Sequence, residues 1–325
     1  MSSIMDARNA EDFGLGIMPA VVEVKDAADW QKAIAAHINQ DKTGQTHYVL
    51  NIHRDLTLNR FDISGGGNNP RITRSVTLSV RGKGRDTTIS LSEGAEKGNL
   101  LRACWGVKII LRDIVLHGRA DNNTPLVTVE GGEFIMKSGS AVTGNSNAHI
   151  HGAGGGVLVH HGKFSMEGSS RVFGNSAGSD GGGVCFYEGT FIMSGNSALY
   201  GNSASLGGGA LLFDGRFIMD ANASIYGNSA SLTGGGVYLS YANFMMRGGT
   251  IYGQNGQSKN SGEENRANTA PQGRAIFFDG NGRALYSANR GFANLFSGNS
   301  GCTDTTVFVK DGSLYKNNVI VSSLP

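Results

Sequence analysis

The chain has 325 residues, of which 50 are Gly and only 5 are Pro, and charged residues make up 17%. A hydrophobic fraction of 39% is too high for a disordered chain, and the scarcity of Pro excludes collagen. The net charge of +2, without a basic block, argues against nucleic-acid binding, and no uncharged apolar run approaches the ~18–20 residues of a membrane-spanning helix.

The first predicted element is a short helix over 26–39, within a segment 25–40 that follows an N-terminal segment 1–24. Asp26 is a suitable N-cap, and Trp30, Ile34 and Ile38 recur every four residues on one face. No charged-then-apolar leader is visible in residues 1–17. We expect the helix to cover the open end of a β structure, because uncovered strand edges promote aggregation.

Residues 47–126 contain β stretches of irregular spacing, at 48–58, 75–80, 87–91, 100–102 and 107–116. Short runs of β-branched and apolar residues bounded by Gly, Asn, Asp and Ser are typical of strands. We interpret them as less regular coils of the structure that the next segment specifies.

Regular repeats of 26–30 residues occupy 127–256. Phe134, Phe164, Phe191, Phe217 and Phe244 are spaced 30, 27, 26 and 27 residues apart, each followed two residues later by Met. A glycine triplet ends eight residues before each of the last four, as in Gly207–Gly209, and an Asn follows each of the first four Phe by eleven residues. Three short strands per repeat without helices indicate a β-solenoid, whose stacked coils are about 4.7–4.9 Å apart.

Stacking in register predicts columns of identical side chains. The Phe and Met columns lie two residues apart, so they share the inward face, and we expect Met to fill gaps between coils. The Asn column predicts a ladder of amides that bond to one another at the turns. In the last copy the sequence is one residue out of step, and Asn255 is the predicted member.

The polar run 257–273 is predicted to be a long loop, and 274–325 to form C-terminal coils and a cap with β stretches at 305–310 and 318–322. The whole chain 1–325 is therefore expected to be one domain. Cys104, Cys185 and Cys302 are widely spaced without a CxxC pair, which favours three isolated thiols over a disulfide framework or zinc site.

These repeats resemble the right-handed parallel β-helix proteins of the pectate-lyase-like superfamily. The segments 234–238 (GGGVY), 191–195 (FIMSG) and 200–204 (YGNSA) are similar to repeats in uncharacterised surface proteins of spirochaetes and other bacteria. A looser similarity connects 208–211 (GGAL) and 296–299 (FSGN) with chlamydial polymorphic outer-membrane proteins. The resemblance implies an all-β, single-stranded right-handed parallel β-helix and a secreted or cell-surface location.

Enzymes of this superfamily cut polysaccharides, so we searched for their site residues. The repeats contain neither the grouped Asp residues that hold Ca²⁺ in the lyases nor the sequence motifs of the hydrolases. One candidate pair remains. Register places Glu188 and Asp214 in adjacent coils with His161 beside them, and retaining glycosidases hold their two carboxyls ~5–5.5 Å apart. The alternative interpretation is a solvated column at a turn between two strands.

Two outward columns are candidate binding surfaces. Phe173, Tyr200, Tyr226 and Tyr252 follow the inward residue of the third strand, and such a stripe suits sugar rings or a protein partner, or stiffens the sheet by self-stacking. Ile135, Ile192, Ile218 and Met245 form an apolar stripe on the second strand, which suggests packing against another chain or cover by the chain's own loop.

The function that we predict from the sequence is a non-enzymatic, exported surface or extracellular protein. Its role is adhesion to a polysaccharide or surface protein, or self-assembly into a structural rod. The alternative is a polysaccharide lyase or glycoside hydrolase acting through Glu188 and Asp214. We predict no cofactor, no metal and no nucleic-acid partner, while the ligand, the oligomeric state, the export route and any bound Ca²⁺ stay open.

Overall fold

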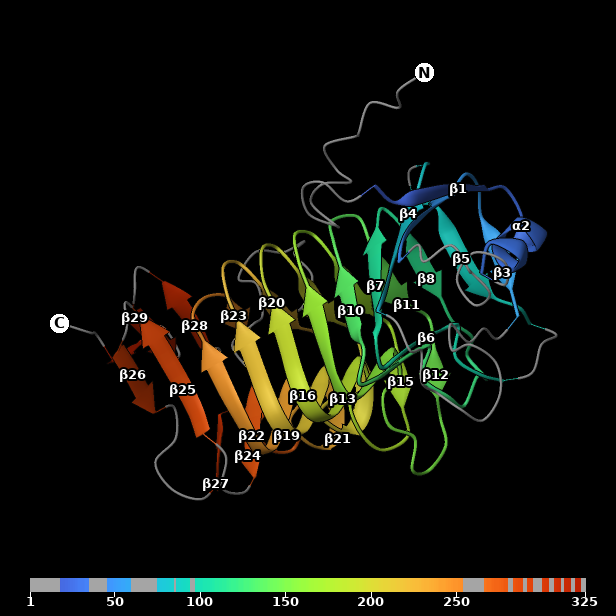
Figure 1. The fold of residues 1–325 in the computed structure, drawn as a ribbon. Helices are drawn as coiled ribbons and strands as arrows, with labels where there is room; N and C mark the ends of the chain where they lie inside the picture. The colour runs from blue at the N-terminus through green and yellow to red at the C-terminus, as the bar shows by residue number, and fades with distance from the viewer. Residues whose placement is uncertain are drawn as a thin grey trace, which may run out of the picture.

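The protein is an all-β, right-handed parallel β-solenoid (Figure 1). The repeats predicted the solenoid, and the resemblance implied its hand. The computed structural model describes residues 18–34, 46–59, 75–84, 86–93, 97–253 and 266–279, and the backbone of six strands between 283 and 322. In Figure 1 the chain ascends the front sheet, crosses to a sheet behind and returns below as it advances from the N-terminal to the C-terminal end. That path has a right-handed sense.

Sheet A forms the front face. It consists of parallel strands paired in a continuous order, namely β1 (Ala20–Val24), β2 (His47–Ile52), β4 (Val76–Gly82), β7 (Val107–Arg112), β10 (Glu133–Met136), β13 (Val157–Met166), β16 (Val184–Met193), β19 (Ala210–Met219), β22 (Val237–Met246) and β24 (Ile276–Asp279). Two more strands, β6 (Leu101–Cys104) and β9 (Val127–Glu130), extend the face beside β13.

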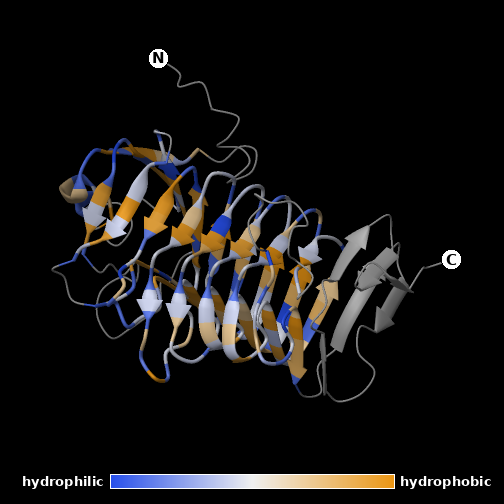
Figure 2. Ribbon diagram, turned by 180° about the vertical axis from the view of Figure 1, so that it is seen from behind, coloured by the Kyte–Doolittle hydropathy of each residue, from blue (hydrophilic) through white to orange (hydrophobic). Residues whose placement is uncertain are grey.

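Sheets B and C complete each coil. The parallel strands of sheet B are β3 (Leu56–Leu58), β5 (Thr88–Leu91), β8 (Val115–His117), β11 (Ala141–Thr143), β14 (Arg171–Phe173), β17 (Ala198–Tyr200), β20 (Ser224–Tyr226) and β23 (Thr250–Ile251). Those of sheet C are β12 (Ser146–Asn147), β15 (Ser176–Ala177), β18 (Ser203–Leu206) and β21 (Ser229–Thr233). Figure 2 shows that the strands carry most of the hydrophobic residues, whereas the connecting turns are largely hydrophilic.

The strands within one repeat differ from the prediction in two ways. The first and second predicted strands join into one ten-residue strand, as in β13, β16, β19 and β22, with a bend at one or two residues of positive φ. The segment that follows the ladder Asn of each repeat was predicted to be only a turn, but it forms the short strands of sheet C. Each coil therefore has three faces.

The predicted inward columns are confirmed. Phe134 pairs in register with Phe164, and the column continues through Phe191, Phe217 and Phe244, with ring centroids 4.8–5.3 Å apart. These rings and the Met column beside them are fully buried. Stacked coils enclose these columns from both sides, so the repetition of the coil forms the core.

The Asn ladder is also confirmed, with one correction. The backbone N–H of Asn175 donates to Oδ1 of Asn202 (3.0 Å), and that of Asn202 donates to Oδ1 of Asn228 (3.0 Å). The next member is Asn268, whose Oδ1 accepts from the Asn228 backbone (2.8 Å), and not the predicted Asn255, which lies outside the described residues. The coil therefore resumes by Asn268, inside the segment predicted to be loop.

The glycine triplets have a steric cause. In Gly207–Gly209, Gly207 has a φ of +62°, which lets the chain turn tightly into the next strand. A Cβ on Gly209 would lie 3.0 Å from Nδ2 of Asn228 and 2.5 Å from the carbonyl oxygen of Gly236. The third glycine therefore makes room for the Asn ladder and for the backbone of the next coil.

Both ends of the solenoid are closed by elements near the predicted positions. The helix α2 (Ala27–Lys32) is N-capped by Asp26, whose side chain accepts from the Asp29 backbone (2.9 Å), and Trp30 and Ile34 are buried. Ile38 lies outside the described residues. At the other end, antiparallel pairing joins the strands β25 (Arg283–Ala288), β26 (Gly291–Asn294), β27 (Ser300–Thr303), β28 (Val307–Lys310), β29 (Ser313–Lys316) and β30 (Val319–Ser322) to the sheets or to one another.

Candidate functional site

The predicted acidic pair lies at the bend of the long strands in sheet A. Glu188, Asp214 and His161 occupy the same position in successive coils, with φ of +61°, +52° and +54°. Nδ1 of His161 and Oε2 of Glu188 are 2.8 Å apart, and both side chains are more than half exposed (54% and 57%). Asp214 is exposed as well. The column is therefore open to solvent, without the water exclusion of an enclosed catalytic site.

The predicted aromatic column of sheet B is present, but its rings stack on one another. The centroids of Phe173 and Tyr200 are 4.9 Å apart with an interplanar angle of 1°, and those of Tyr200 and Tyr226 are 4.9 Å apart at 2°. Tyr252 turns edge-on to Tyr226 (76°), and the guanidinium of Arg266 lies over both rings. Because each face is covered by the next ring, this column presents ring edges and hydroxyls outward instead of the open faces that we expected.

The predicted apolar stripe on sheet A is not an exposed row. Ile135 is buried (8% exposed), and Ile192, Ile218 and Met245 are half-buried. Ser165, which lies between Ile135 and Ile192 in the same column, is buried too (2% exposed). The area available to another chain along this stripe is therefore smaller than the pattern suggested.

A different row of aromatic side chains lies beside the bend of sheet A, with three rings exposed and two half-buried. We call it the aromatic ridge and define it as Trp105, His160, Tyr187, Phe213 and Tyr241. Trp105, Phe213 and Tyr241 are 59%, 45% and 52% exposed. Much of the surface of these three rings is therefore in contact with solvent.

The rings of the ridge are tilted where they are most exposed. His160 stacks on Tyr187 (5.1 Å, 17°), but Tyr187 and Phe213 meet at 53° and Phe213 and Tyr241 at 66°. The ring of Trp105 packs so closely against Gly131 that a Cβ on this glycine would overlap with it. Tilted rings leave their faces uncovered, in contrast to the stacked column of sheet B.

Polar contacts hold the middle of the ridge in place. The hydroxyl of Tyr187 donates to Oδ2 of Asp180 (3.1 Å), and burial together with the nearby Cys185 and Asp180 raises the pKa of Tyr187. Burial lowers the pKa of His160, against the opposing effect of Glu130. Burial likewise raises the pKa of the Cys185 thiol, which makes it unreactive. Cys104 and Cys185 are both free thiols.

The spacing of the ridge was visible in the sequence. His160, Tyr187 and Phe213 are 27 and 26 residues apart, and each precedes the inward Phe of its coil by four residues. The same position holds Glu130 and Ser240 in the flanking coils. We missed the row because Tyr241, its next member, lies one residue later, at the bend itself.

Within the described residues, no group of three or more His, Cys, Asp and Glu side chains is arranged to hold a metal ion. In the same part of the chain no helix is long and apolar enough to cross a membrane. Comparisons of the chain with protein-family models, with curated proteins and with solved structures gave no match. The structure itself establishes the parallel β-solenoid.

Proposed function

We propose that this protein is a non-enzymatic binding protein, secreted or displayed on a cell surface, that holds an extended glycan along the aromatic ridge. The observation that carries the proposal is the pair of exposed rings of Phe213 and Tyr241 in adjacent coils, which meet at 66° and continue the row of His160 and Tyr187. Exposed aromatic faces pack against the C–H faces of sugar rings, and the ridge is flanked by the carboxylates of Glu188 and Asp214, which accept hydrogen bonds from hydroxyls.

The backbone conformation at the bend supports a functional role for the side chains of this surface. His161, Glu188, Asp214 and Tyr241 all adopt left-handed φ, whereas Gly131 occupies the position in the preceding coil. An L-residue costs about 1–2 kcal/mol in this region, and a bulky residue such as Tyr is a true outlier. Glycine adopts this conformation without strain, so the presence of bulkier side chains here, above all Tyr241, supports a role for them beyond folding.

The test is affinity electrophoresis in gels that contain neutral, acidic or amino-sugar polysaccharides. We expect at least one polymer to retard the wild-type protein, and Tyr241→Gly and Phe213→Ala to lose that retardation. Tyr200→Ala is the matched control, because the faces of its ring are already covered and retardation should persist. Equal retardation of wild type and both ridge variants, or no retardation by any polymer, refutes the proposal.

A second candidate is a polysaccharide lyase or glycoside hydrolase acting through Glu188 and Asp214. The favouring observation is the close pair of Glu188 and His161 directly beside the ridge, where a bound chain would pass. An assay for new reducing ends or unsaturated products distinguishes it. Cleavage that Glu188→Ala or Asp214→Ala abolishes would replace the binding role by an enzymatic one.

A further inference from the structure

A groove of about 930 Å³ lies on the outer face of sheet B, away from the ridge. Its floor is formed by Thr57, Ser90 and His117, which are register neighbours in β3, β5 and β8. The volume lies near the top of the ~300–1,000 Å³ that is usual for small-molecule sites.

The groove is hollow because two of its three floor residues, Thr57 and Ser90, carry small side chains. The same column continues from His117 through Thr143 to Phe173, Tyr200 and Tyr226. In those later coils aromatic rings fill the outer face, whereas Thr57 and Ser90 leave it open. The outer face of sheet B is therefore recessed in the N-terminal coils and covered by aromatic rings in the later coils.

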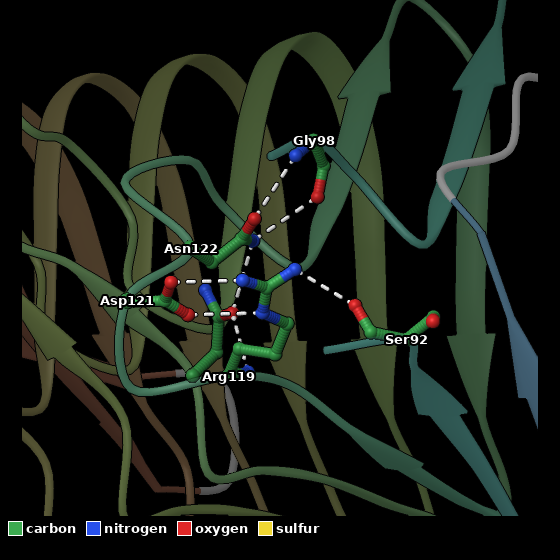
Figure 3. Close-up of polar contacts among 6 residues, drawn as sticks. Ser92, Gly98, Arg119, Asp121 and Asn122 are labelled. Carbon is green, nitrogen blue, oxygen red and sulfur yellow. Dashed lines mark hydrogen bonds and ion pairs between the residues drawn. The ribbon is translucent and has the colours of Figure 1, made fainter. Parts of the chain in front are cut away.

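The wall of the groove is rigidly built, as Figure 3 shows. The guanidinium of Arg119 donates from Nε and Nη2 to the two carboxylate oxygens of Asp121 (2.9 and 2.8 Å) and from Nη1 to the carbonyl oxygen of Ser92 (2.7 Å). Its side chain is only 9% exposed. The buried amide of Asn122 exchanges two hydrogen bonds with the backbone of Gly98 (2.9 and 3.0 Å). Such fixed walls limit the entropy that a ligand must overcome.

The groups that face the groove are mostly neutral hydrogen-bonding groups. The floor offers the hydroxyls of Thr57 and Ser90, which both donate and accept. When Nδ1 of His117 donates to the Gly118 carbonyl (3.0 Å), Nε2 of the neutral ring is an acceptor. The carboxylate of Asp121 is held in place and 62% exposed.

The charges at the groove offset one another. The Arg119 fork is occupied by Asp121 and Ser92, so it offers little to a ligand carboxylate, and Glu93 adds a further negative charge to the lining. The positive charges of Arg119 and Lys97, which lower the pKa of Asp121, would repel a cationic ligand. We propose that this groove is a binding site for a neutral, hydroxyl-rich ligand, namely a neutral oligosaccharide. The proposal does not depend on the ridge.

The experiment is calorimetric titration of the full chain with neutral gluco-, manno- and galacto-trisaccharides, beside uronate and amino-sugar trisaccharides. We expect one neutral trisaccharide to bind, and Ser90→Tyr to weaken it at least tenfold by filling the groove as Tyr200 fills the column elsewhere. His117→Phe, which removes the Nε2 acceptor together with the Nδ1 contact to the Gly118 carbonyl, is expected to weaken binding several-fold. Thermal melting verifies that both variants fold.

Phe213→Ala is the control that separates the two sites, because it alters the ridge and leaves the groove intact. Trisaccharide binding that persists in Phe213→Ala and is lost in Ser90→Tyr supports the groove, whatever happens to polysaccharide binding at the ridge. Binding only of charged trisaccharides, binding of none, or equal affinity in wild type and folded Ser90→Tyr overturns the proposal.

Discussion

Replacing Asn202 by Ala tests whether the Asn ladder is a main determinant of the fold. Asn202 is 1% exposed and lies in the middle of the ladder. Its Oδ1 accepts from the backbone N–H of Asn175 (3.0 Å) and from its Nδ2 (3.2 Å). Its own Nδ2 donates to Oδ1 of Asn228 (3.0 Å) and to the carbonyl oxygen of Val172 (3.1 Å). The substitution therefore removes contacts to both neighbouring coils at once.

The magnitude follows from what each partner loses. The buried N–H of Asn175 is left without its acceptor, which costs about 1–3 kcal/mol. Nδ2 of Asn175 keeps two carbonyl acceptors, and Oδ1 of Asn228 keeps the backbone donor of residue 202, so the other losses are ordinary hydrogen bonds of about 0.5–1.5 kcal/mol each. We expect the free energy of unfolding to fall by about 4 kcal/mol.

Urea denaturation measures this loss as a lower midpoint at an unchanged slope. Hydrogen exchange gives a local reading, since the amide of Asn175 should exchange faster than those of the Phe column. Asn222→Ala is the matched control, because Asn222 makes a single exposed amide contact, with Oδ1 of Asn196 (3.2 Å), and should cost within about 0.5 kcal/mol. If Asn202→Ala costs no more than this control, the ladder does not stabilise the stack.

Three further predictions concern packing and charge. Gly209→Ala forces a Cβ against the carbonyl oxygen of Gly236 and should lower the free energy of unfolding in urea by about 1–3 kcal/mol; wild-type stability would contradict the steric account of the triplet. Trp30→Ala empties the buried contact between helix and first coils, and thermal melting should show a loss of about 3–5 kcal/mol. Burial opposes ionisation of Glu133, but hydrogen bonds from Lys163 and Lys108 outweigh it and lower its pKa below the ordinary 4.5. The stability that this carboxylate adds, under about 1 kcal/mol at a partly exposed site, is therefore present above pH 4.5 and lost as the pH falls further, so wild type and Glu133→Gln should converge in urea midpoint at low pH.

The inward columns were predictable because solenoid stacking converts a sequence period directly into contact. Once Phe134 and Phe164 are aligned, every coil that keeps the period has its Phe, Met and Asn positions fixed. The prediction was wrong where the period is interrupted. The chain between Gly253 and Arg266 displaces the next ladder residue to Asn268, and no pattern in the sequence marks where an insertion ends.

The groove was not predictable for a related reason. Arg119 and Asp121 lie in the irregular coils, where no repeat assigns them a position, and the hydrogen bond from Arg119 to Ser92 depends on how two such coils stack. The sequence did indicate that Thr57 and Ser90 belong to β stretches, whereas His117 lies one residue beyond the predicted stretch 107–116. Only the strand register shows that they continue the column of Phe173 and Tyr200 and so form a recess.

Side-chain orientation explains why the binding surface that we propose differs from the one expected from sequence. Alternation along a strand predicts that Tyr200 and Tyr226 point outward, and they do, but it says nothing about the direction of their planes. At one-coil spacing on a regular strand the rings fall into parallel stacking, 4.9 Å apart, and cover their own faces. Beside the bend of sheet A, Phe213 precedes the left-handed residue of its strand, whereas Tyr241 is itself that residue, so the two rings start from different register positions and meet at 66°. Regular register thus hides the ring faces of Tyr200 and Tyr226, whereas the shift in position between Phe213 and Tyr241 exposes theirs.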